Sequence, residues 1–190
     1  MRIGNNGMLL AGWQTVERAL EVFSTSEDLL NVAGSPEGVK DLGVILGGDV
    51  VMLQERMAIA SNHMPRVQTD ESTMVMAFTT AMLEDHAAKG SGWSVSNRIS
   101  DYAGDPGADS ARNAIRAIDG RRVPGGTYRV VLGPQTLTEI LEWVLMPSLY
   151  LDTFYAGAST FLGKWGRKVA SEDLRLYDDG AAPGRAASKA

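Results

Sequence analysis

The sequence contains no cysteine and only two histidines, and both scarcities limit the chemistry open to it. Without cysteine the chain can form neither a disulfide nor a thiolate metal site. A zinc site at His86 would have to borrow its neighbours Glu84 and Asp85, and adjacent positions on a strand or turn rarely converge on one ion. We therefore interpret His63 and His86 as parts of exposed polar turns, and we expect no cofactor in this chain.

Long apolar runs and basic clusters are also missing. No stretch approaches the roughly 20 apolar residues that a transmembrane helix needs, and the opening residues 1–6 lack the apolar run of a signal peptide. The formal net charge of -5 is spread along the chain, whereas nucleic-acid-binding proteins carry a basic patch. The absence of cysteine fits a reducing compartment. We therefore expect a cytoplasmic protein that contacts neither a membrane nor nucleic acid.

The remaining composition is that of an ordinary globular protein, with 44% hydrophobic and 22% charged residues among 190. This length allows one large domain or two small ones. The turn signal Pro124-Gly125-Gly126 marks a boundary, so we assign residues 1–122 to an N-terminal and middle region and residues 123–180 to a second region. Residues 181–190 are expected to form a flexible tail, because they hold too little apolar surface to become ordered.

The N-terminal segment carries two competing patterns. Residues 2–12 are predicted to form a hairpin, because Asn5-Asn6-Gly7 supplies residues that tolerate a positive φ. The apolar residues of 15–23 follow helical spacing and predict a helix, with a strand as the alternative.

A second helix and a loop are expected next. Ser24-Thr25-Ser26-Glu27 has the form of a capping box and predicts a helix over residues 25–33. Gly34 should end this helix, and Ser35-Pro36 could open another short one. The glycines of residues 43–48 predict a loop, which lacks the Gly-Lys-Ser/Thr ending of a phosphate-binding loop.

The middle of the chain is rich in β-branched and aromatic residues, punctuated by Asn, Asp and Gly. This texture predicts three antiparallel strands over residues 50–60, 73–82 and 92–100. A helix is predicted over residues 108–118, where alanines and isoleucines share one face. The fold class is therefore α+β.

After residue 123 the pattern predicts a strand, a helix and a second strand. Residues 127–132 have strong strand character. Residues 136–146 form an apolar helical pattern with five leucine, isoleucine or valine residues on its inward face. A short strand is predicted over residues 174–177, followed by an Asp-Asp-Gly turn.

Three stretches of the chain resemble the TldD/PmbA family, known as modulators of DNA gyrase or peptide-maturation metallopeptidases. They are residues 121–134, 157–171 and 176–185, and their order and spacing agree with the family. The resemblance implies that residues 127–132 and 136–146 are the opening strand and helix of the family's C-terminal metallopeptidase-like domain. It also implies that the chain spans only part of a family member.

Peptidase members of this family carry a His-Glu-x-x-x-His motif that binds zinc, and the glutamate can polarise a zinc-bound water. Counted back from Phe161 without gaps, the motif positions hold Glu142, Trp143 and Pro147. Tryptophan and proline offer no lone pair for zinc, and one carboxylate cannot hold it alone. This resembles the PmbA (TldE) branch, whose members lack the motif and pair with a TldD subunit that has it. Zinc is then expected only in such a partner.

The resemblance implies a non-catalytic partner subunit in the proteolytic maturation or degradation of small unfolded peptides. Two alternatives stay open: a metallopeptidase active in its own right, and a dimerisation scaffold without a proteolytic role. The partner is expected to be a TldD-like subunit or a second copy of the chain. A group of apolar residues after the motif helix is the candidate interface: Leu149, Tyr150, Leu151, Phe154 and Tyr155.

Overall fold

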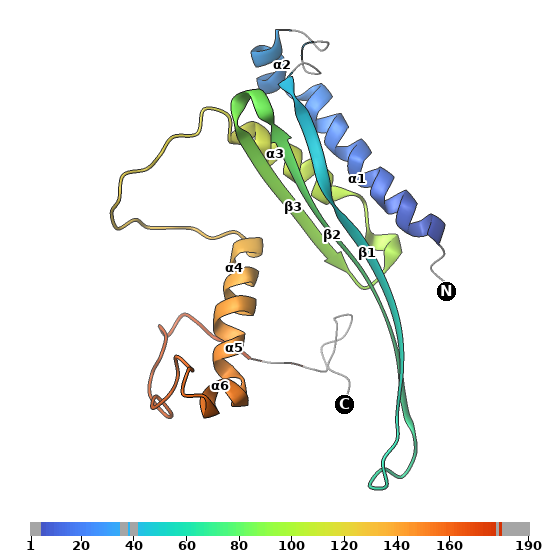
Figure 1. The fold of residues 1–190 in the computed structure, drawn as a ribbon, viewed down its shortest axis with the longest axis vertical. Coiled ribbons are helices and arrows are strands. Elements are labelled where there is room, and N and C mark those ends of the chain that lie inside the picture. Colours follow the sequence, from blue (N-terminus) through green and yellow to red (C-terminus); the bar gives the residue numbers. More distant parts are fainter. Residues whose placement is uncertain (1–4, 35–37, 39–41, 178, 180–190) are drawn as a thin grey trace. The chain divides into compact units, whose positions relative to one another are not determined.

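A computed structural model describes residues 5–34, 38, 42–177 and 179. The chain divides into two compact units (Figure 1): the N-terminal unit, which runs to Arg122, and the C-terminal unit, Val123–Asp179. Helices and antiparallel strands occur together, which confirms the α+β class. Within the described ranges, no helix combines the length and the apolar character needed to cross a membrane.

The first element is the helix α1, Asn5–Thr25. Its buried residues recur every fourth position, at Ala11, Thr15, Ala19 and Phe23, so they form one stripe along the helix. The predicted helix over 15–23 is confirmed, and its strand alternative is wrong. The hairpin predicted over 2–12 is wrong from residue 5 onward, because the buried stripe reaches back to Ala11 and packing overrides the local turn preference.

The helix α2, Glu27–Ala33, confirms the second predicted helix with a shifted cap. The hydroxyl of Ser26, rather than of Ser24, accepts the Leu29 N–H at 3.4 Å. Gly34 ends the helix in the left-handed conformation with φ 74°, as predicted. The further helix suggested at Ser35-Pro36 lies outside the described residues.

Three antiparallel strands follow in the order β1-β2-β3: β1 Val44–Ile59, β2 Gln68–Leu83 and β3 Ala88–Ser96. The three predicted strands are confirmed, although the third ends at Ser96 and not at residue 100, and the predicted loop over 43–48 is wrong after Gly43. A Cβ atom at Gly48 would lie 2.2 Å from the Phe78 carbonyl oxygen on β2. The glycine therefore allows two paired strands to approach, and does not mark a loop.

The two predicted histidine turns are both found between strands. His63 lies in the turn between β1 and β2, and His86 ends the 3₁₀ helix η2, Glu84–His86, between β2 and β3. The β2–β3 pairing extends only from Val75 to Leu83 of β2. The outer ends of β1 and β2, residues 54–59 and 68–73, therefore continue beyond β3 as a two-stranded arm (Figure 1).

The helix α3, Asp105–Arg116, follows the short 3₁₀ helix η3, Ile99–Asp101, and confirms the helix predicted over 108–118. It lies so close to β3 that a Cβ at Gly90 would come within 2.1 Å of the Ala114 backbone nitrogen. Helices α1 and α3 lie on the same face of the sheet (Figure 1). The main core between them contains Ala19, Phe23, Leu29, Ala81, Leu83, Ala88, Ala111, Ala114 and Ile115.

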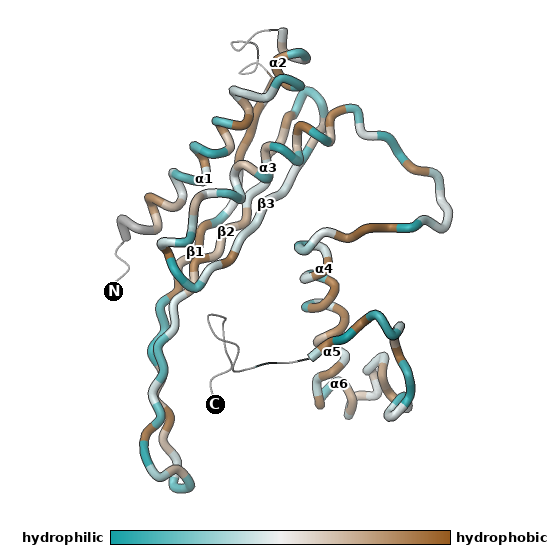
Figure 2. The backbone as a smooth tube through the Cα atoms, turned by 180° about the vertical axis from the view of Figure 1, so that it is seen from behind, coloured by the Kyte–Doolittle hydropathy of each residue, from teal (hydrophilic) through white to brown (hydrophobic). Residues whose placement is uncertain are grey.

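The C-terminal unit is built on a chain of helical segments. These are α4 Pro134–Ile140, the π-helical segment η4 Leu141–Leu145, α5 Met146–Leu149 and α6 Leu151–Tyr155. The helix predicted over 136–146 is confirmed in type and extends further in both directions. Figure 2 shows hydrophilic and hydrophobic residues mixed along α4, and hydrophobic residues are more frequent in η4.

The strands predicted over 127–132 and 174–177 are wrong, because neither segment has regular structure. Val131, in the middle of the first segment, is 92% exposed. A strand needs a neighbour for its N–H and C=O groups. The described part of this unit contains no strand that could supply one.

Candidate functional site

The helix that carries the motif positions begins at a strong start signal. Gly133 precedes it, Pro134 occupies its first turn, and the Leu137 N–H donates to the Gly133 carbonyl at 3.0 Å. Proline suits this place because its fixed φ matches the helix and its missing N–H would be unpaired there anyway. The Thr138 hydroxyl adds a bond of 2.9 Å to the Pro134 carbonyl.

A π-helical turn interrupts this helix at the motif positions. The Met146 N–H donates to the Leu141 carbonyl, five residues back, instead of four. The cause is Pro147, which has no N–H, and whose ring in an α-helix would clash with the carbonyl four residues earlier, that of Trp143. Widening the preceding turn relieves this clash. The wider turn also brings residues five apart, such as Glu142 and Pro147, closer to one face of the helix.

The side chains at these positions do not form a metal site. Glu142 and Trp143 are exposed, the latter by 73%, while Pro147 is half-buried. Indole nitrogen is a hydrogen-bond donor only, and proline has no side-chain acceptor. In the ranges that the structure describes, no three histidine, cysteine, aspartate or glutamate side chains come together to hold a metal ion. The residues present therefore do not fit the zinc of the family's peptidase motif.

Two serines link the end of this helix to the loop that follows α6. The Ser159 hydroxyl donates to the Ser148 carbonyl at 2.6 Å and accepts the Phe161 N–H at 3.1 Å. The Ser148 hydroxyl donates to the Val144 carbonyl at 2.8 Å. Both serines are only 7% exposed. The sequence reasoning missed this connection, because serines in a polar loop carry no pattern that identifies a buried partner eleven residues away.

The candidate interface residues lie directly after the motif helix. Leu149, Tyr150, Leu151 and Tyr155 are between 47% and 84% exposed, and Phe154 is half-buried. They belong to the end of α5, to α6 and to the residue between them. Tyr155 is the most exposed of them at 84%. The C-terminal unit therefore presents an apolar surface next to the motif positions.

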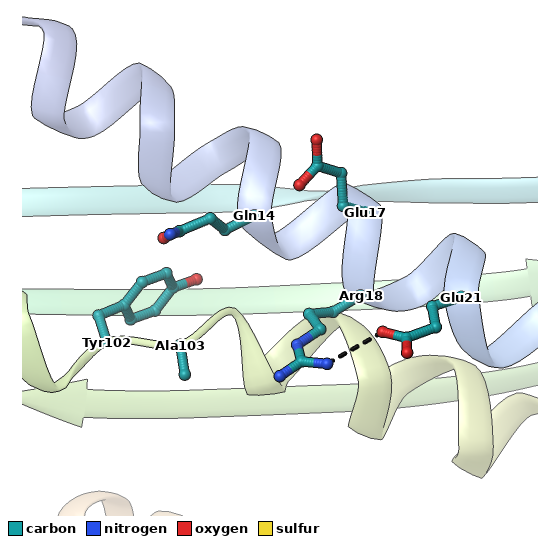
Figure 3. A pocket seen from close by; sticks show the side chains of 6 residues that line it. All are labelled: Gln14, Glu17, Arg18, Glu21, Tyr102 and Ala103. Atoms are coloured by element: carbon teal, nitrogen blue, oxygen red, sulfur yellow. Dashed lines mark hydrogen bonds and ion pairs between the residues drawn. The ribbon is translucent and has the colours of Figure 1, made fainter.

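The N-terminal unit contains a shallow polar pocket of ≈ 470 Å³ beside α1. Figure 3 shows its lining side chains, which come from α1 and from the segment before α3. The Arg18 guanidinium pairs with the Glu21 carboxylate at 2.9 Å, and both side chains are at least half exposed. The residues lining the pocket are Gln14, Glu17, Arg18, Glu21, Tyr102 and Ala103.

The hydroxyl of Tyr102 has a structural partner within this region. It shares a hydrogen bond with the Thr15 hydroxyl, which also bonds to the Ala11 carbonyl at 2.8 Å. Burial raises the pKa of Tyr102 above 10.0, an effect that the Asp105 charge adds to and the bond to Thr15 opposes. Because these hydroxyls are engaged in joining α1 to the segment before α3, they do not form a nucleophile and base pair directed at the pocket.

Comparison with known families identifies the C-terminal part of the chain. Residues 125–190 match the family model described as the PmbA/TldA metallopeptidase C-terminal domain. Searches of curated proteins and of solved structures gave no significant match. The matched segment is therefore related to the C-terminal domain of metallopeptidases. This match supports the resemblance of residues 125–190 to the TldD/PmbA family.

Proposed function

We propose that this chain is a PmbA (TldE)-like, non-catalytic subunit of a cytoplasmic peptide-processing complex. One observation carries the proposal: the chain matches the metallopeptidase family over residues 125–190, yet Glu142, Trp143 and Pro147 stand at the zinc-motif positions. A zinc peptidase needs at least three protein ligands and a bound water. A chain without them can contribute shape and contacts to a processing site, while a TldD-like partner supplies the zinc.

The apolar surface of the C-terminal unit supports the pairing part of the proposal. Leu151 and Tyr155 are 68% and 84% exposed, although both are large apolar side chains. Clustered exposed residues of this kind mark interaction sites more often than ordinary surface. Tyrosine is also enriched at protein interfaces, because it combines a large apolar ring with a polar tip. The proposed contact surface is therefore Leu149, Tyr150, Leu151, Phe154 and Tyr155.

The proposal is tested by co-expression with a homologue that bears the His-Glu-x-x-x-His motif. We expect the two chains to co-purify, with zinc stoichiometric to the motif-bearing chain and peptide hydrolysis in the complex. Alone, this chain should retain far less than one zinc per molecule after dialysis, as measured by atomic mass spectrometry. One tightly held zinc per isolated chain, or peptidase activity without the partner, would contradict the non-catalytic assignment.

Two variants in the same unit separate specific pairing from non-specific association. Tyr155→Asp should weaken co-purification, because it places a charge in the proposed contact surface. Val131→Asp is the matched control, since Val131 is 92% exposed but lies outside that surface. Equal loss of pairing in both variants would show that the C-terminal unit associates through a different region. Failure of any homologue to bind would favour the scaffold alternative.

A further inference from the structure

The β-sheet of the N-terminal unit has one apolar face that no described element of the same unit covers. Side chains alternate between the two faces along each strand. On β2, Val75, Ala77, Ala81 and Leu83 are buried beneath the helices. The intervening residues lie on the opposite face, which we call the open face. Its large apolar residues are between 39% and 49% exposed: Ile45, Val51, Leu53, Met76, Phe78 and Val95.

The open face has the composition of an interface core. Its centre is the cross-strand pair Phe78 and Trp93, and the next pair along the strands is Met76 and Val95. Aromatic residues and methionine are enriched in interface cores. Beyond Leu53 the arm becomes more polar, with Gln54, Glu55 and Arg56, before Met57 and Ile59 near its tip. The densest apolar region therefore lies on the three-stranded part of the sheet.

The size of the open face fits a specific contact. Three strands about 4.8 Å apart, over nine residues that each rise about 3.3 Å, give a flat footprint of about 400 Å². Two such faces together, with the relief of their side chains added, approach the roughly 1,000 Å² that a specific interface needs. A region of this size is comparable to the largest apolar patch of a typical monomer, and such patches are often functional.

The charges of the open face indicate which kind of partner can pack on it. Within its three-stranded part it carries one carboxylate, Asp49, opposite Phe78, and one ammonium group, Lys89, opposite Met82. The net charge of this part is therefore zero, so two copies do not repel each other there, and a highly charged partner gains nothing from it. Flat apolar sheet faces pack against each other about 10 Å apart, with strands nearly aligned. We propose that a second copy of this chain packs its open face on the first and forms a two-sheet sandwich.

This contact is independent of the proposed pairing with a TldD-like subunit, which involves the C-terminal unit. A competing apolar surface exists on α1, where Leu9, Trp13 and Leu20 are between 55% and 64% exposed at helical spacing. Self-association through that stripe is a distinct outcome, and the variants below separate the two surfaces.

Sedimentation velocity on the full chain alone provides the first test. We expect a dimer at tens of micromolar, and Phe78→Glu should raise the dissociation constant at least about 30-fold, as expected for a central anchor residue. Trp13→Glu and Val131→Glu are the controls and should leave the dimer unchanged. Circular dichroism establishes that each variant is folded. A monomeric native chain, or a dimer that Trp13→Glu dissociates and Phe78→Glu does not, overturns the proposal.

Disulfide trapping gives a second readout that does not depend on weakening the contact. The chain has no cysteine, so a single introduced cysteine can only pair with another copy. Thr80→Cys lies on the open face of the central strand, and Ser24→Cys lies on exposed α1 as the matched control. We expect covalent dimers for Thr80→Cys in mild oxidant at dilute concentration. Equal cross-linking of both variants would contradict a contact through the open face.

Discussion

The two units of this protein contrast sharply in how they are held together. In the N-terminal unit, Leu29 and Leu83 are fully buried, and glycines allow α3 to lie directly on β3. In the described part of the C-terminal unit, the only buried residues are Ser148 and Ser159. Large apolar residues are present in both units, but among the described residues only the first unit fully buries some of them. Burial of apolar area is the dominant favourable term in folding, so the first unit has its own source of stability.

The comparison shows that a family match and a recognisable helix do not by themselves make a core. The helix from Pro134 to Leu149 has a good start signal and local hydrogen bonds. Local signals of this kind contribute about 1 kcal/mol or less each, whereas most helical stability in proteins comes from packing an apolar face. The described part of the C-terminal unit therefore gains less stability from apolar burial of its own than the N-terminal unit does.

The largest expected effect is the difference between two glycine-to-alanine substitutions, one in each unit. Gly90→Ala should destabilise the N-terminal unit by about 3 kcal/mol or more, because the new Cβ would lie 2.1 Å from a backbone nitrogen of α3. Gly125→Ala has nothing within 4 Å and should stay within about 0.5 kcal/mol. Urea denaturation followed by circular dichroism measures both. Similar small losses would show that α3 can move away from β3 at little cost.

A smaller effect is expected from removing one hydroxyl in each unit. Tyr102→Phe should cost about 1 kcal/mol, because the hydroxyl bonds Thr15 in a site that is 7% exposed. Tyr155→Phe should cost almost nothing, since that ring is 84% exposed. The denaturation midpoints of the two variants, measured at neutral pH, show whether Tyr102→Phe loses more stability than Tyr155→Phe. Equal losses would indicate that the Tyr102 bond adds no net stability.

The pH dependence of stability gives a further test of the Tyr102 hydroxyl. Burial raises its pKa in the folded state above the ordinary value of 10.0. In the folded state the Tyr102 hydroxyl therefore stays protonated to a higher pH than in the unfolded state. The stability that neutral Tyr102 contributes is intact below pH 10 and is lost as the pH rises above 10. Native protein should lose more stability than Tyr102→Phe between neutral pH and the region above pH 10. Parallel pH profiles for the two proteins would contradict this.

The smallest expected effect is at the motif position Glu142. Glu142→Gln should change the free energy of unfolding by less than about 0.5 kcal/mol, because the side chain is exposed. It should also leave binding to a TldD-like subunit unchanged, since Glu142 lies outside the proposed contact surface. Denaturant melts and co-purification test the two statements. A loss above roughly 2 kcal/mol would mean that Glu142 is buried and paired in the assembled protein.

Elements that depend on short-range patterns could be predicted from the sequence. β-branched and aromatic residues between turn signals identified all three strands, and Gly34 was correctly placed as the end of α2. The predictions that were wrong depend on distant neighbours. Residues 127–132 have strand character but no strand to pair with in the described structure, and Gly48 serves strand pairing where its residue type suggested a loop. Propensity describes what a segment can do, and pairing decides what it does.

The candidate site divides in the same way. Residue identity alone determined that Trp143 and Pro147 cannot ligate zinc, because coordination chemistry belongs to the side chain and needs no fold. The π-helical turn at Pro147, the buried link from Ser159 to Ser148 and the open face centred on Phe78 were decided only by the tertiary structure. Each of these depends on which backbone and side-chain groups are brought together or left uncovered, and such proximity arises only when the chain has folded.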